Sequence, residues 1–128
     1  MAISPKVIET LSTHRQQVRA GGGADKLEAR HRKGLLGARE RLAVLFDADT
    51  FQEGGAYVRH CGTHFGMEAR ELPADGVISG TGFVDGMQVA AFSQDFTVAA
   101  GTLGKMHARK IVDVMRVALK NGTPLVAF

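Results

Sequence analysis

The sequence has a single cysteine, Cys61, among its 128 residues. One thiol cannot build a disulfide framework, so small disulfide-rich secreted proteins are excluded and the cytoplasm is the natural compartment. No apolar run approaches the roughly 18 residues needed to cross a bilayer, and residues 1–5 lack the pattern of a secretory signal. The first residues are mildly amphipathic and contain Arg15 and Arg19, so a mitochondrial transit peptide is an alternative to an ordinary helix. The mitochondrial matrix is therefore the alternative location in a eukaryote.

Aromatic residues are also scarce, with no tryptophan, one tyrosine and seven phenylalanines. Most of the phenylalanines stand at core-like positions, so stacking platforms for single-stranded nucleic acid are poor. Positive charge is nevertheless concentrated from Arg15 to Arg41, where eight Lys or Arg accompany three Asp or Glu. This surplus indicates an anionic partner or, alternatively, a solvated or subunit-facing surface. A stand-alone module that binds CoA or nucleic acid is thus an alternative function, although we predict no nucleic-acid partner.

Residues 1–48 are predicted to form a helical segment. Ser4 and Pro5 suit the first positions of a helix, and the glycines at 21–23 end it. A short charged helix is expected over 24–33, and a third helix follows it. The apolar face of the first helix is Val7, Ile8, Leu11 and Val18, and that of the third is Ala38, Leu42, Leu45 and Phe46.

Residues 49–128 are predicted to be α/β. The segment 51–60 reads as extended and 62–74 as loop, and strands over 77–84 and 87–92 flank an Asp85-Gly86 hairpin turn. Residues 104–120 read as a helix, and 125–128 as a buried parallel strand. Since the sequence ends inside that strand, we expect a fragment of a longer chain. The core stripe predicted for the long helix is Ile111, Met115, Ala118 and Leu119.

Two stretches resemble one known family when taken together. The first is Gly37-Ala-Arg-Glu-Arg-Leu-Ala-Val-Leu-Phe-Asp47, followed by Thr50-Phe-Gln-Glu53. The second is Asp75-Gly-Val-Ile-Ser-Gly-Thr-Gly82, followed by Phe92-Ser-Gln-Asp-Phe-Thr-Val-Ala-Ala-Gly-Thr-Leu-Gly104 and His107-Ala-Arg-Lys-Ile111. They are similar to the carboxyltransferase (beta) subunits of biotin-dependent acyl-CoA carboxylases of the propionyl-CoA type. The resemblance implies an α/β fold in which amino-terminal helices precede part of a crotonase-like (ClpP/crotonase) core of repeated strand-strand-helix units. It divides the chain into a helical segment, 1–48, and an incomplete carboxyltransferase domain, 49–128.

This resemblance also implies an activity. The family moves a carboxyl group between carboxybiotin and the α carbon of an acyl-CoA, and similar chains instead decarboxylate acyl-CoA substrates. Backbone N–H groups stabilise the enolate, and the family's pair of oxyanion glycines would follow Phe128. We therefore expect no catalytic residue within the chain and an inactive fragment. The partners implied are an acyl-CoA, biotin on a carrier protein or domain, a biotin carboxylase component and further copies of the chain, with no membrane.

By the same resemblance, the loop of Ala99, Ala100, Gly101 and Thr102 should border the acyl-CoA pocket. Small residues let a ligand approach the backbone, and the following helix start offers free N–H groups. A tight turn without a ligand is the alternative. Arg39 and Arg41 could meet CoA phosphates, or else lie at an interface or in solvent. Lys105 is at the crowded positive start of the last helix, which indicates an anionic neighbour or plain solvation.

Other polar residues are given simpler roles. His60, Cys61 and His64 lie close together, but a fourth ligand at suitable spacing is absent, so we predict no metal site. Cys61 is predicted to be a buried thiol. Asp95 could act as a general base, although fixing the adjacent loop is the favoured role.

Overall fold

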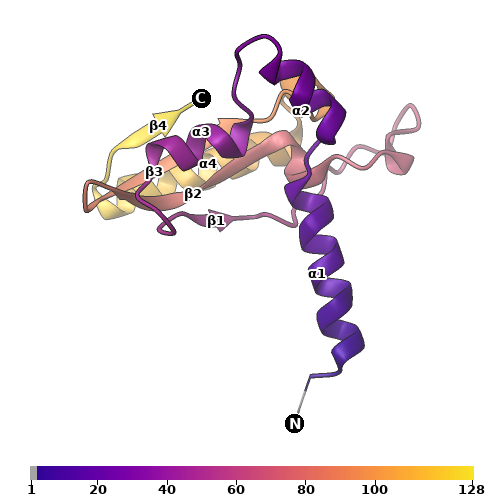
Figure 1. Cartoon of the computed structure of the whole chain (residues 1–128), viewed down its shortest axis with the longest axis horizontal. Helices are drawn as coiled ribbons and strands as arrows, with labels where there is room; N and C mark the ends of the chain where they lie inside the picture. The colour runs from indigo at the N-terminus through magenta and orange to yellow at the C-terminus, as the bar shows by residue number, and fades with distance from the viewer. Residues whose placement is uncertain (1–2) are drawn as a thin grey trace.

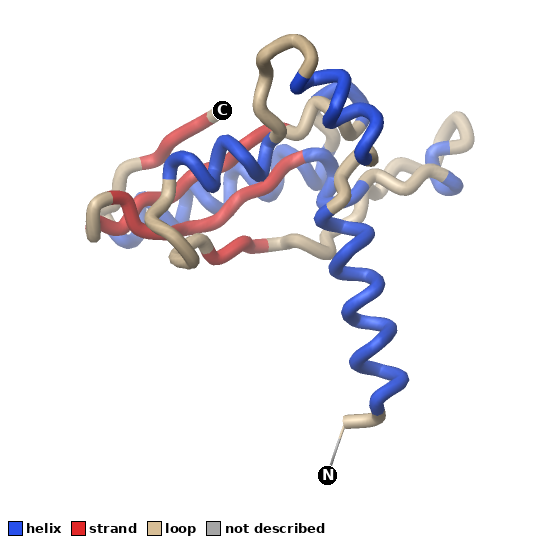
Figure 2. Tube along the Cα trace, in the orientation of Figure 1, coloured by secondary structure: helices blue, strands red, loops and turns tan. Residues whose placement is uncertain are grey.

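The computed structural model describes residues 3–128, which form a small mixed sheet with helices on its two faces (Figures 1 and 2). Within these residues the helices are α1 (Pro5–Arg19), α2 (Ala24–His31), α3 (Ala38–Leu45) and α4 (Lys105–Asn121). The strands are β1 (Gln52–Gly54), β2 (Val77–Val84), β3 (Met87–Gln94) and β4 (Leu125–Ala127). Short 3-10 turns occupy Met67–Ala69, Pro73–Gly76 and Ala99–Gly101.

The β2–β3 hairpin is the longest pairing in the sheet and confirms the prediction from the Asp-Gly pair. The two strands run antiparallel from Val77 opposite Gln94 to Val84 opposite Met87. Asp85 and Gly86 both have positive φ angles, +48° and +77°, as a type I′ hairpin turn requires. The Asp47 carboxylate accepts the N–H groups of both turn residues at 3.0 Å, which ties the chain after α3 to the hairpin.

The strands are ordered β1-β2-β3-β4, with β4 parallel to β3. The helix α4 makes the connection between the parallel pair, as predicted. Within these 128 residues β4 lies at the edge of the sheet, where Leu125 and Phe128 are 36% and 37% exposed, and burial of the strand in a longer chain stays a prediction. Only three residues of the segment 51–60 join the sheet, as β1.

The core lies on the two faces of the hairpin. Alternate residues of β3 point to opposite sides, so Val89 and Ala91 pack toward α3 while Ala90 packs toward α4. The α3 face is closed by Leu42 and Phe46, which confirms the apolar stripe expected there. The α4 face contains Val114 and Ala118.

Two predicted apolar faces are confirmed only in part. Of the stripe predicted for α4, Ala118 is buried, whereas Met115 and Leu119 are 48% and 84% exposed; the other buried residues of the helix are His107, Lys110 and Val114. The buried stripe has ordinary helical spacing, but its first two members are polar. In α1 only Val18 is buried, because the amino-terminal half of the helix projects away from the sheet (Figure 1). Val7, Ile8 and Leu11 are therefore exposed.

No helix among residues 3–128 is long and apolar enough to cross a membrane.

Candidate functional site

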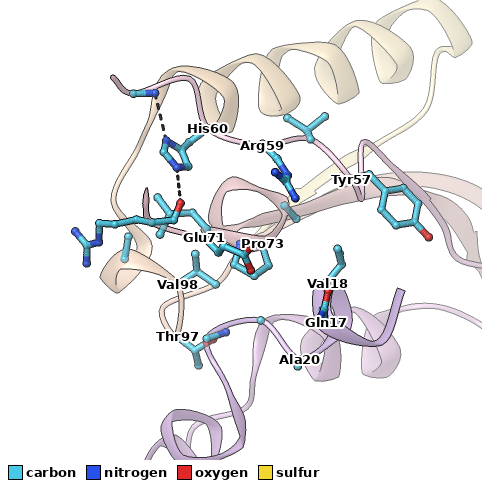
Figure 3. Close-up of a pocket in the computed structure, with 18 of the residues that line it drawn as sticks. Gln17, Val18, Ala20, Tyr57, Arg59, His60, Glu71, Pro73, Thr97 and Val98 are labelled. Carbon is cyan, nitrogen blue, oxygen red and sulfur yellow. Dashed lines mark hydrogen bonds between the residues drawn. The ribbon is translucent and has the colours of Figure 1, made fainter. Parts of the chain in front are cut away.

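A cleft of about 1150 Å³ lies where α1 meets the loops at one end of the sheet (Figure 3). One wall is the end of α1 with the glycines that follow it, and the others are the segments 56–63, 68–74 and 96–100. In Figure 3, Gln17 and Val18 of α1 lie across the cleft from Tyr57 and Arg59, with Thr97 on a further side. The cleft is therefore built from four segments that are far apart in the sequence.

Charged side chains of both signs line the cleft, with more cations than carboxylates. Lys26, Arg59 and Arg70 supply positive charge, whereas Glu68 and Glu71 supply negative charge. Excess positive charge in a concave site attracts anionic ligands. Small residues occupy the wall at Ala99 and Ala100.

Asp95 and Thr97 join the loop after β3 to the amino-terminal helices. The Asp95 carboxylate accepts the Thr97 N–H at 2.9 Å and the Thr97 hydroxyl at 2.6 Å. The hydroxyl in turn accepts the Gly22 N–H at 3.0 Å, and Lys26 Nζ donates to the Thr97 carbonyl at 3.3 Å. Asp95 thus fixes the adjacent loop, as the favoured interpretation predicts, and this contact sets one wall of the cleft.

Replacing Thr97 with valine is expected to destabilise the protein by about 2 kcal/mol, because it leaves the Gly22 N–H and the Asp95 carboxylate without their shared partner. Chemical denaturation measures this free energy of unfolding. Thr123→Val is the matched control, since the Thr123 hydroxyl is buried but has no hydrogen-bond partner within the described residues. The control should be neutral or slightly stabilising, and equal losses in the two variants would contradict the assigned role of Thr97.

His60 holds two walls of the cleft together. Its Nε2 donates to the Arg70 carbonyl at 2.8 Å, and its Nδ1 accepts the Gly62 N–H at 3.2 Å (Figure 3). This pattern uses both ring nitrogens of a neutral imidazole. Cys61 is exposed, so its prediction as a buried thiol is wrong; the surrounding loop runs outside the core. Among residues 3–128, no group of three or more His, Cys, Asp or Glu side chains is arranged to hold a metal ion.

The predicted loop residues lie together at or beside the cleft. Ala99 and Ala100 line it, and Gly101 and Thr102 complete the same turn. Ala99, Ala100 and Gly101 have positive φ angles of +46°, +55° and +73°, and the Thr102 hydroxyl donates to the Ala99 carbonyl at 2.6 Å. The turn therefore holds an unusual backbone conformation that presents small residues to the cleft.

The three predicted cations lie outside the cleft. Arg39 forms an ion pair with Glu53 at 2.6 Å that joins α3 to β1. Arg41 Nη2 donates to the Gln94 carbonyl at 2.7 Å, and its guanidinium lies 5.9 Å from the centre of the Phe128 ring. Burial lowers the pKa of Arg41 below its ordinary value, with a smaller contribution from Arg30. Lys105 is exposed at the start of α4.

Several cleft residues were not singled out from the sequence. The glycines at 21 and 22 read only as the end of a helix, whereas they pack against Asp95 and Thr97. Arg59 lies in a segment with no recognisable motif, and Lys26 was one of many cations. A pair of glycines between helices was the single available signal, since it permits a close approach of two backbones.

The comparisons with known proteins agree with one another. Residues 29–128 match the model of the carboxyl transferase domain family. The chain is 48% identical over 126 residues to the methylmalonyl-CoA decarboxylase subunit alpha of Propionigenium modestum, covering 98% of this chain and 24% of that protein. It is 43% identical over 120 residues to the propionyl-CoA carboxylase beta chain of Cereibacter sphaeroides, covering 94% and 24%.

A solved structure also matches the whole chain. The transcarboxylase 12S, determined with methylmalonyl-coenzyme A and methylmalonic acid bound, matches with a TM-score of 0.95 and 43% identity. The match covers 100% of this chain and 25% of that one. The chain thus spans about a quarter of the length of the proteins it resembles.

Proposed function

Since the chain belongs to the carboxyl transferase domain family, we propose that it forms the amino-terminal part of an enzyme that moves a carboxyl group between carboxybiotin and the α carbon of an acyl-CoA. The family identified by resemblance in the sequence is confirmed, as is the crotonase-like α/β fold. The chain covers about a quarter of the length of its relatives, so the activity, substrates and partners of the whole protein are proposed here. The boundary at residue 48 stays a prediction.

One observation carries the proposal, namely the match of the entire chain to a structure determined with methylmalonyl-coenzyme A bound. We assign the acyl-CoA to the cleft, with Ala99, Ala100, Gly101 and Thr102 at its border. The positive balance of the cleft supports an anionic ligand. Arg39 and Arg41 already contact protein groups, whereas Lys105 is exposed, so of the predicted cations we keep only Lys105 as a candidate for a CoA phosphate that extends beyond the cleft.

The proposed chemistry requires donors that stabilise an enolate on the thioester oxygen, and backbone N–H groups can supply them. The parallel pair β3–β4 ends at neighbouring residues, since the Gln94 N–H donates to the Phe128 carbonyl at 3.0 Å. Chain that follows Phe128 in an intact enzyme would therefore begin beside the loop 95–104, at the carboxyl edge where α/β sheets bind ligands. We place the oxyanion donors there and no catalytic residue in this chain.

The remaining components of the reaction are assigned to other chains. Biotin would arrive on a carrier protein or domain after loading by a biotin carboxylase component, in a homo-oligomeric cytoplasmic enzyme. A biotin-dependent acyl-CoA decarboxylase is the second candidate, because the methylmalonyl-CoA decarboxylase subunit alpha of Propionigenium modestum is 48% identical to this chain.

Titration of the 128-residue chain with CoA tests the cleft assignment. We expect amide chemical shifts of the segments 20–22, 56–63 and 97–101 to move together, and Ala100→Leu to weaken binding about tenfold by placing a larger side chain on the cleft wall. The matched control is Ala48→Leu, an exposed alanine outside the cleft. Unperturbed cleft amides at millimolar CoA, or equal binding by the two leucine variants, would overturn the assignment.

The same preparation should show no carboxyl transfer with biotin and propionyl-CoA or methylmalonyl-CoA.

A further inference from the structure

The turn at Ala74–Gly76 has a backbone conformation that its sequence does not favour. Ala74, Asp75 and Gly76 have φ angles of +53°, +49° and +71°, and two of the three residues are not glycine. A left-handed conformation at a non-glycine residue costs free energy and persists only where its surroundings impose it.

Two buried residues of α4 form hydrogen bonds with this turn. Lys110 Nζ donates to the Ala74 carbonyl at 2.8 Å and also to the Val77 carbonyl. His107 Nδ1 bonds to the Asp75 carbonyl at 2.8 Å, and the His107 N–H donates to the Asp75 carboxylate at 2.7 Å. His107 and Lys110 are 0% and 5% exposed, and their spacing of one helical turn puts both on the same face.

The bonds of His107 fix its tautomer. Because a carbonyl can only accept, Nδ1 carries the proton, and Nε2 is left to accept from the Gln94 side-chain amide at 3.2 Å. Burial lowers the pKa of His107, which favours this neutral form. The imidazole thus acts as a fixed donor to the turn.

The turn also packs against the segment 95–98, part of which lines the cleft. A Cβ atom on Gly76 would lie 3.6 Å from His107 Nδ1 and 3.4 Å from the Val98 carbonyl oxygen, so Gly76 fits between them. The Gly76 carbonyl also accepts the Asp95 N–H at 2.8 Å. Pro73 and Ala74 on one side, and Val98 and Ala99 on the other, line the cleft.

We infer that His107 and Lys110 are positioning residues that hold the left-handed turn Ala74–Gly76 and, through Gly76, fix the cleft wall at Val98–Ala100. Neither side chain touches the cleft. The inference rests on the proposed function only where it takes acyl-CoA as the ligand of that wall. Its structural part concerns the backbone alone and can be measured without any ligand.

Nuclear magnetic resonance of the 128-residue chain tests the structural part. The wild-type imidazole should show the Nδ1–H tautomer in its nitrogen shifts. Three backbone amides report on the conformation of the turn and of the cleft wall. The His107 amide donates to the Asp75 carboxylate, the Asp95 amide to the Gly76 carbonyl, and the Gly101 amide to the Val98 carbonyl. In His107→Leu and Lys110→Met these amides should exchange with solvent about tenfold faster, as expected when a buried hydrogen bond is lost.

His107→Asn is the conservative variant, because its side-chain amide can place a donor near the position of Nδ1 and should restore slow exchange. Lys120→Met is the matched control for Lys110→Met, since Lys120 is exposed on the same helix. An Nε2–H tautomer in the wild type, or unchanged exchange at Asp95 and Gly101 in Lys110→Met, would overturn the inference even if His107→Leu does not fold.

CoA titration separates this inference from the proposed function. If the wild type binds, Lys110→Met should bind about tenfold more weakly and Lys120→Met as the wild type does. Equal binding by Lys110→Met, despite faster exchange, would refute the link to the cleft and leave the proposed function intact. If the wild type does not bind, the cleft assignment fails, and the exchange rate of the Gly101 amide alone decides whether these residues fix the wall.

Discussion

Replacing Gly22 with alanine is expected to lower the free energy of unfolding by about 3 kcal/mol or more and the Tm by roughly 10 °C. A Cβ atom at this position would lie 1.8 Å from the carbonyl oxygen of Thr97 and 2.3 Å from its carbonyl carbon. Both are backbone atoms, so no side-chain rotation can relieve the overlap. The two segments must move apart, which breaks the Gly22 N–H bond to the Thr97 hydroxyl and the Lys26 bond to the Thr97 carbonyl.

The control for this substitution is Gly54→Ala, where the nearest atom to an added Cβ is the Ser79 carbonyl oxygen at 3.9 Å. It should change stability by less than about 0.5 kcal/mol. Thermal unfolding followed by circular dichroism gives both values, and the Thr97 amide shift reports whether the contact is lost. A Tm for Gly22→Ala within about 2 °C of the control would mean that the amino-terminal helices do not depend on this contact.

The sequence predicts those parts of the fold that depend on local patterns. The Asp85-Gly86 pair and the alternating residues around it define the β2–β3 hairpin without any long-range information. The apolar spacing of α3 likewise identifies Leu42 and Phe46 as core residues. In these elements the local preference and the tertiary environment agree.

The prediction fails where polar groups are buried by partners distant in the sequence. Hydrophobicity favours Met115 and Leu119 as the buried face of α4, but His107 and Lys110 lie inside because backbone carbonyls 32 to 36 residues earlier accept their hydrogens. Nothing in the residues around α4 reveals those acceptors. A buried lysine is rare unless it is paired, so pattern alone argues against it.

The candidate site shows the same division. The small residues at Ala99 and Ala100 are a local signal, and they do line the cleft. The sequence does not reveal the partner of Arg39, because its ion pair with Glu53 depends on how α3 packs beside β1. The opposite wall depends on the contact between Gly22 and Thr97, which are 75 residues apart. Such a contact could be inferred only after the topology is known.

Stability is expected to rise with pH above about 8 because of Lys110. Burial lowers the pKa of this ammonium from its ordinary value of 10.5 to about 8 in the folded protein. The groups facing it are the Glu53 and Asp75 carboxylates, which favour the charged form, and Arg39, which opposes it. His107 lies one turn away on the same helix face.

The sign of the effect follows from proton linkage. Below pH 8 the lysine is charged in both states, and the folded protein bears the full cost of burying the charge. Between the two pKa values the unfolded chain binds more protons, so the free energy of unfolding increases with pH. Above 10.5 the amine is neutral in both states and the gain is complete. Each pH unit contributes about 1.4 kcal/mol, which gives an upper limit of about 3 kcal/mol.

Lys110→Met isolates this contribution, since methionine has a similar length and no titrating group. Urea denaturation of both proteins at pH 7, 8.5 and 10 gives the difference between their free energies of unfolding, in which all other alkaline titrations cancel. We expect the wild type to gain about 2 to 3 kcal/mol relative to Lys110→Met across this range. Lys120→Met should follow the wild type, because its lysine is exposed. A pH-independent difference between the wild type and Lys110→Met would show that the Lys110 ammonium has an ordinary pKa and that the carbonyls of Ala74 and Val77 offset the cost of its burial.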